Sequence, residues 1–159
     1  MTRAVGGMQR RMYHRHRPNL LARVLNRIWA VHFASGVLAP RHGVTLEVRG
    51  RHTGRLVSFP LVLVPLDGER YLVSMLGEGT NWVANVRADH GHAVLRRGDA
   101  ERVRLVEVDV AARPPVLRRF LELAPGARPH APVDRRAPEA EFARVADRFP
   151  VFRVTPDPG

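Results

Sequence analysis

Between residues 43 and 110 the sequence alternates short apolar runs with tight-turn signals, and this alternation limits the folds that are open to the chain. Asp67-Gly68 and Arg97-Gly98-Asp99 are turn sequences typical of β-hairpins. The strand-like runs between such turns cover residues 44–48, 58–65, 71–76, 93–96 and 101–110. Five strands joined in this way predict an antiparallel meander, and closing it into a barrel would remove its exposed edges.

Helical patterns flank and interrupt these strands. Apolar residues recur at helical spacing over residues 19–35 and 81–88, and Pro114 with Pro115 begins a third helix. A proline-containing loop at 125–138, interpreted as a binding lid or as a surface crossing, precedes a helix at 139–148 and a short strand at 151–154. The predicted class is α+β, mainly β, with a basic tail at 1–18 and one domain at 19–159.

The charge of the chain favours anionic partners. The sequence of 159 residues carries 26 Lys plus Arg, all of them Arg, against 15 Asp plus Glu, for a net charge of +11. GC-rich coding would explain the arginine bias, and so would a site for carboxylate or phosphate groups. The basic tail and the amphipathic helix at 19–35 could rest on an anionic membrane surface, or the helix could pack on the domain.

Several classes of protein are excluded by residues that the sequence lacks. The absence of Cys excludes disulfides, thiolate zinc sites and Cys nucleophiles, and it agrees with a cytoplasmic location. Phosphate-binding, nucleophilic-serine and dinucleotide-binding glycine motifs are missing. The pairs His14/His16 and His90/His92 have no carboxylate cluster nearby, so no metal site is predicted.

A basic, glycine-containing turn is the first of two informative segments. Residues 49–60 read Arg-Gly-Arg-His-Thr-Gly-Arg-Leu-Val-Ser-Phe-Pro. Its two glycines allow close approach of the backbone to a ligand, and its side chains supply hydrogen-bond donors without a competing carboxylate. Such a turn suits an anion, although many basic hairpins are only solvated turns.

The second segment runs from a strand through a glycine-containing turn into a helix. Residues 74–87 read Ser-Met-Leu-Gly-Glu-Gly-Thr-Asn-Trp-Val-Ala-Asn-Val-Arg. Backbone amides at such a junction can hydrogen-bond a phosphate or the polar edge of a flat heterocycle. Taken alone, Trp82 would be interpreted as a core residue.

Together the two segments resemble the deazaflavin (coenzyme F420) dependent nitroreductase and quinone reductase family. That family carries a Gly-Arg-x-Thr/Ser-Gly turn, a proline early in the following strand and a Trp-x-x-Asn helix start. The matching residues here are Gly50, Arg51, Thr53, Gly54 and Pro60 in the first motif and Trp82 and Asn85 in the second. The closing residues 148–154 also resemble one branch, and the similarity covers roughly residues 40 to 155.

The resemblance implies a split β-barrel, similar to flavin mononucleotide (FMN) binding barrels, with N-terminal and peripheral helices. It places the phosphate and oligoglutamate tail of the deazaflavin on Arg51, His52 and Thr53. The strand under the cofactor contributes Val57, Ser58, Phe59 and Pro60, and the ring side contributes Ser74, Met75, Leu76, Gly77, Asn81, Trp82 and Asn85. Because the cofactor carries the chemistry, no catalytic side chain is predicted.

This chain departs from the family pattern at two positions and one turn. Many relatives have Lys where His52 stands and Arg where Val57 stands, so Arg49 or Arg55 would have to supply that charge. The turn between Ser74 and Trp82 is also shorter than in the nitroimidazole-reducing members, which leaves the substrate open.

The sequence thus predicts an F420-dependent reductase of quinones, nitroaromatics or another activated double bond. It would be cytoplasmic, peripheral to the inner face of the membrane through its N-terminal helix, with a small-molecule electron acceptor as substrate and a homodimer as an open alternative. One rival is an FMN oxidoreductase on the same barrel. The other is a non-enzymatic binder of anionic membrane or nucleic acid, of which nucleic acid is disfavoured because basic and aromatic residues are not interleaved.

Overall fold

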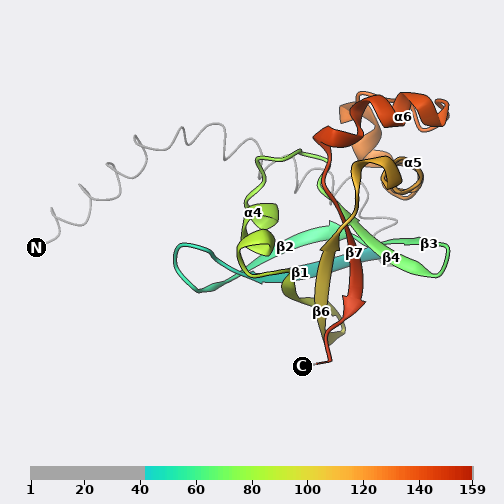
Figure 1. Ribbon diagram of the computed structural model, residues 1–159. Helices are drawn as coiled ribbons and strands as arrows, with labels where there is room; N and C mark the ends of the chain where they lie inside the picture. The colour runs from blue at the N-terminus through green and yellow to red at the C-terminus, as the bar shows by residue number, and fades with distance from the viewer. Residues whose placement is uncertain (1–41, 159) are drawn as a thin grey trace, which may run out of the picture.

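The computed structural model describes residues 42–158, which form a curled antiparallel sheet with helices inside and at one end (Figure 1). The predicted tail at 1–18 and the helix expected at 19–35 lie outside the described residues. The sheet has seven strands: β1 (Gly43–Arg49), β2 (Leu56–Val62), β3 (Val64–Leu66), β4 (Glu69–Val73), β5 (His92–Arg97), β6 (Asp99–Glu107) and β7 (Val151–Pro156).

The strand order shows how the sheet curls into a half-barrel. It runs β2-β1-β5-β6-β7-β4-β3, with every neighbouring pair antiparallel. β2 and β3 form opposite edges of this order, yet only Leu63 separates them in the chain. A single bent run of residues therefore supplies both edges, which brings the two edges together at Leu63.

The meander predicted from the sequence is correct for the hairpins and wrong for the pairing between them. The β1–β2, β3–β4 and β5–β6 hairpins form as expected. A meander would pair β5 with β4, but in the structure β5 pairs with β1. The terminal strand β7 lies between β6 and β4, with Leu105 opposite Val154 and Leu72 opposite Phe152. Apolar alternation determines which face a residue occupies but not which strand lies beside it.

Two apolar clusters occupy opposite faces of the sheet. The inner cluster fills the half-barrel and includes Leu46, Leu72, Val103 and Phe152, together with residues from helix α4 (Asn81–Ala88). The outer cluster lies around the β3–β4 end of the sheet and also includes Val62 at the end of β2 and Val151 at the start of β7. There Val64 and Val73 pack against the helices α5 (Pro114–Leu123) and α6 (Glu139–Val145), which lie together at the top of Figure 1.

The remaining elements are short and agree with the sequence patterns except in one loop. The described residues include three short 3-10 helices: η1 (Val110–Ala112), η2 (Pro125–His130) and η3 (Ala146–Arg148). η2 occupies the first half of the segment expected to be a proline-containing loop. Arg128 of η2 donates from Nε to the Leu121 carbonyl at 2.8 Å, which satisfies a carbonyl near the C-terminal end of α5.

The connection from α4 into β5 passes so close to β6 that only glycine fits. Gly91 has φ +85°, and a Cβ at this position would lie 2.3 Å from the carbonyl oxygen of Leu105. Its backbone donates to Val86 and accepts from the Leu105 amide at 2.8 Å. Gly91 therefore fixes α4 against the middle of the sheet, inside the half-barrel.

Candidate functional site

The basic turn between β1 and β2 is closed by its own hydrogen bonds. The Gly50 amide donates to the Arg55 carbonyl at 2.7 Å and the Gly54 amide to the Gly50 carbonyl at 2.8 Å. The Thr53 hydroxyl accepts from the Arg55 amide at 3.2 Å, and the Arg49 guanidinium donates to the Gly54 carbonyl at 3.0 Å. These contacts fix the backbone of the turn, and residues 51–55 stay exposed.

One side-chain contact joins the two motifs that the sequence separates by 34 positions. Asn85, in the last half of α4, is 5 % exposed, and its Oδ1 accepts from the Arg51 amide at 3.1 Å and from Arg51 Nη1 at 2.8 Å. The turn is thereby anchored to the helix. A guanidinium has five N–H donors, so this contact leaves Arg51 most of its donors for a ligand.

The glycine-containing turn before α4 is built around one carbonyl. The hydroxyls of Ser74 and Thr80 lie 2.8 and 2.6 Å from the Gly77 carbonyl oxygen and 2.5 Å from each other. Two hydroxyl hydrogens cannot serve three contacts, so one of the three is a close approach without a hydrogen. Both side chains are buried, at 2 % and 4 % exposure, which makes Ser74 a structural residue of the turn.

Within residues 42–158, no side chain caps the start of α4. Thr80 stands at the N-cap, but its hydroxyl makes no cap hydrogen bond to the helix. The first backbone N–H groups of a helix have no partner within the helix and carry its positive dipole end. Asn81, the first helical residue, is exposed beside them.

Other predicted site residues point into the protein. Trp82 is 1 % exposed and lies with its ring centroid 5.6 Å from that of Phe152, so it packs in the inner cluster. Met75 contacts the outer cluster on the opposite face of the sheet. The turn at 74–80 therefore sends neighbouring side chains to different faces, and Trp82 and Met75 do not share one surface.

Strand β2 is an edge strand in the sheet order, and Pro60 is compatible with that place because it has no N–H to donate. Val57 is half-buried against the inner cluster and Phe59 belongs to it, whereas Ser58 is exposed. The predicted residues that remain accessible near the turn and α4 are Arg51, His52, Thr53, Ser58 and Asn81, with Val57, Pro60, Leu76 and Gly77 half-buried.

An ion network that the sequence did not suggest links this site to the helical end of the molecule. Arg87, on α4, donates to Glu78 at 2.8 Å and to both carboxylate oxygens of Glu107 at 2.9 and 2.8 Å. Hydrogen bonding from Arg87 lowers the pKa of Glu107 against the opposing effect of its burial, and the charge of Arg113 assists. Arg113 extends this ion network, because its Nη2 donates to Glu107 Oε2 at 3.2 Å.

Arg113 is a buried cation whose donors are used on backbone carbonyls. At 4 % exposure it donates to Val108 at 2.9 Å, to Ala146 at 3.0 Å and to Phe149 at 3.4 Å. It thus ties the end of β6 to η3 and the approach to β7. No spacing rule in a single sequence reveals such a network, because its members lie on elements that only the fold brings together.

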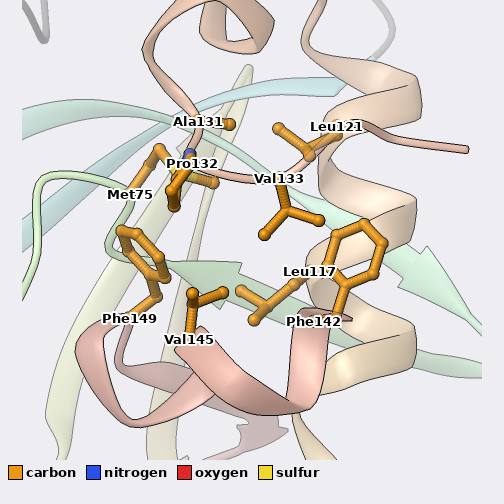
Figure 2. Close-up of a pocket in the computed structure, with 9 residues that line it drawn as sticks. All are labelled: Met75, Leu117, Leu121, Ala131, Pro132, Val133, Phe142, Val145 and Phe149. Atoms are coloured by element: carbon orange, nitrogen blue, oxygen red, sulfur yellow. The ribbon is translucent and has the colours of Figure 1, made fainter. Parts of the chain in front are cut away.

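A small apolar hollow lies between α5, α6 and the 131–133 loop (Figure 2). Met75, Leu117, Leu121 and Phe149 are among its lining residues. Its volume is about 10 Å3, which is room for about one water molecule. The hollow is therefore a packing defect of the outer cluster and no candidate for a cofactor the size of a flavin.

Comparison with known proteins supports the fold and no closer relationship. No protein-family model and no curated protein matches the sequence. Among solved structures, an F420-H2 dependent reductase shares 23% identity at a TM-score of 0.51 over 72% of this chain and 95% of its own. A chain described as a domain-swapped dimer shares 22% identity at a TM-score of 0.50 over 72% and 81%.

A heme binding protein from Mycobacterium smegmatis also matches, with 11% identity and a TM-score of 0.52 over 80% of this chain and 51% of its own. Identities this low concern the fold alone. The predicted mainly β fold of the split-barrel type is confirmed. Among residues 42–158, no helix is long and apolar enough to cross a membrane.

Proposed function

We propose that the protein is an F420-dependent oxidoreductase that reduces a quinone, a nitroaromatic or another activated double bond. The observation that carries the proposal is the contact between Arg51 and Asn85, which joins the basic turn to the second half of α4, about one turn after the start of the helix. The likeness of the fold to an F420-H2 dependent reductase supports the same assignment.

The residues of the turn fit the anionic part of such a cofactor. Arg51, His52, Thr53 and Arg55 are exposed, and residues 49–55 contain no carboxylate that would repel an anion. In the proposal these side chains bind the phosphate and carboxylate groups of the tail. Charge-assisted hydrogen bonds of this kind are stronger than neutral ones, and guanidinium groups match carboxylate and phosphate geometry.

The residues at the start of α4 would hold the ring. In the proposal the uncapped amides of α4 donate hydrogen bonds to a polar ring edge beside exposed Asn81, and half-buried Val57 and Leu76 provide apolar contact. When bound, the reduced deazaflavin supplies the hydride, and the chain binds it, orients it and excludes water. Trp82 and Ser74 act behind the surface in this proposal, by holding α4 and the 74–80 turn in place.

Glu78 is assigned no proton-transfer role, because both of its oxygens face Arg87, at 2.8 and 3.4 Å. Turnover of the Glu78→Gln variant should therefore stay within a few-fold of that of the wild type. A loss of turnover with retained cofactor affinity would assign Glu78 to the chemistry instead.

The deciding experiment is a titration of the purified full chain with F420, FMN and heme, followed by fluorescence or absorbance. Saturable binding of F420 with weaker binding of FMN and heme supports the proposal. Preference for FMN would establish the flavin oxidoreductase on the same barrel. Preference for heme would instead support a heme-binding function for this protein.

Three further assignments belong to the same proposal. The protein would lie in the cytoplasm, with residues 19–35 contacting the inner face of the membrane, and the electron acceptor would be a small molecule. A homodimer is proposed because one solved structure of this fold is described as a domain-swapped dimer. Sedimentation velocity at several protein concentrations would measure that assembly directly.

A further inference from the structure

The outer face of the β5–β6–β7 sheet carries a group of arginines that the proposed cofactor site does not use. Leu95, Val103, Leu105 and Val154 point into the half-barrel, so residues one position away point outward. The outward arginines are Arg96 on β5, Arg102 and Arg104 on β6, and Arg153 on β7; we refer to these four as the arginine face.

The pairing of the strands fixes these side chains in one pattern. Arg102 lies opposite Val94 and Arg153 opposite Val106, on neighbouring strands. Strands are about 4.8 Å apart and alternate residues of one strand about 7 Å apart. The four guanidinium groups therefore project from a rigid area three strands wide.

The positive charge of the arginine face is mostly not neutralised. Glu47 pairs with Arg96, and Arg104 donates to the His90 carbonyl at 3.2 Å. Within the described part of the chain, Arg102 and Arg153 have neither an ion-pair nor a hydrogen-bond partner for their guanidinium groups. Arginines without a carboxylate partner, held on a rigid sheet, favour an external anion.

Apolar residues lie between the arginines. Val106 is 41 % exposed although it lies near the middle of the sheet, and Val94 is half-buried beside Arg102. The outer cluster, to which α5 and α6 contribute, includes Val151 at the start of β7, whereas Arg102, Arg104, Val106 and Arg153 are exposed. A surface that combines arginines with exposed aliphatic side chains suits the boundary between lipid headgroups and acyl chains.

We infer that the arginine face is a second docking surface of this protein and that its partner is an anionic lipid bilayer. This surface is made of other residues than the segment 19–35 and does not depend on the proposed cofactor. A nucleic acid fits less well, because the outward residues of β5, β6 and β7 within residues 42–158 include no Phe, Tyr or Trp on which bases could stack. Tyr71, opposite Arg153 on β4, is half-buried against the outer cluster.

The test compares variants that lose the same charge in different places. In the full chain, Arg102→Gln with Arg153→Gln removes two charges from the arginine face. Arg136→Gln with Arg144→Gln removes two charges near and on α6, where both side chains are exposed. Co-sedimentation is measured with vesicles of phosphatidylcholine alone and of phosphatidylcholine with phosphatidylglycerol, at low and high salt.

A basic residue near an anionic surface contributes about fivefold to binding, so the face variant should bind anionic vesicles roughly 25-fold more weakly. The control variant should lose much less, and Arg102→Lys with Arg153→Lys should keep most of the binding. Circular dichroism confirms that each variant is folded.

Equal binding of the face and control variants to anionic vesicles would overturn the inference. Failure of the wild-type protein to bind anionic vesicles would overturn it as well. A face variant that loses binding to duplex DNA but not to vesicles would assign the surface to nucleic acid. Deleting residues 1–18 in both backgrounds separates the tail from the face, because the two losses should multiply if both surfaces contact the bilayer.

Discussion

At the scale of single residues, Arg51 has both a structural and a proposed binding role. Arg51→Ala should weaken deazaflavin binding by about 1–3 kcal/mol, the range for a hydrogen bond to a charged group, and should reduce the salt dependence of binding. Fluorescence titration at two salt concentrations measures both effects. Arg136→Ala removes an exposed arginine outside the site and is the matched control.

The contact with Asn85 allows the two roles of Arg51 to be separated. Asn85→Ala leaves the charge of Arg51 in place and removes only its anchor. If Arg51 binds the cofactor directly, Asn85→Ala should weaken binding less than Arg51→Ala and should keep the wild-type salt dependence. Equal losses and equal salt dependence in both variants would mean that the turn matters only through its shape.

Trp82 illustrates how burial changes the meaning of a motif residue. It is 1 % exposed and contacts Phe152. Trp82→Ala should therefore lower the free energy of unfolding by about 3–5 kcal/mol, the range for removing a buried aromatic side chain. Urea denaturation checks this value. A fully stable variant that had lost only cofactor affinity would place the indole at the ligand instead.

At the scale of elements, the position of α4 on the sheet depends on the close contact between the backbones of Gly91 and Leu105. Gly91→Ala adds a Cβ 2.3 Å from the Leu105 carbonyl oxygen and should cost more than about 3 kcal/mol. Gly98→Ala is the matched control, because its φ of +81° is similar and nothing lies within 4 Å of the added Cβ. That variant should lose only the conformational strain, about 1–2 kcal/mol. Similar losses in the two variants would contradict the close approach.

The ion network between α4 and β6 predicts a dependence on pH. The folded pKa of Glu107 lies below its unfolded value, so its contribution is complete above the unfolded pKa near 4.3 and is lost as pH falls through the folded pKa. Glu107→Gln should cost about 1 kcal/mol at pH 7, since the side chain is 35% exposed. The difference from wild type should shrink below about pH 4 in urea denaturation. A constant difference from pH 7 to pH 3 would exclude this ionic contribution.

The elements themselves were largely predictable, and the reason is local. Alternation and turn residues located the strand regions but predicted residues 58–65 as one strand, where the structure has both β2 and β3. The pattern of Trp82, Val83 and Val86 gave α4 its bounds. The position of β7 between β6 and β4 could not be predicted from the sequence. The edges of antiparallel strands offer similar hydrogen-bonding groups, so side-chain packing decides which strands pair. The same limit hid the contacts of Glu107 and Arg113, whose partners lie on elements far apart in the chain.

At the scale of the whole molecule, stability should depend on β7 far more than on the N-terminal residues. Deleting residues 150–159 removes a central strand and the core residues Phe152 and Val154, so the chain should lose cooperative unfolding. Deleting residues 1–18 should leave the urea midpoint nearly unchanged. Circular dichroism during urea titration compares the two truncations. A cooperative transition without β7 would show that the half-barrel closes through other contacts.

The central place of β7 also has a consequence for how the protein is made. β7 follows every other strand in the sequence, yet it fills the gap between two strands that were synthesised earlier. Until it emerges from the ribosome, the edges of β4 and β6 have no partner and can pair with the same edges of a neighbouring nascent chain. Translation at about 5–20 residues per second therefore sets how long each new molecule stays vulnerable to aggregation, and chaperones that shield strand edges should matter most in that interval.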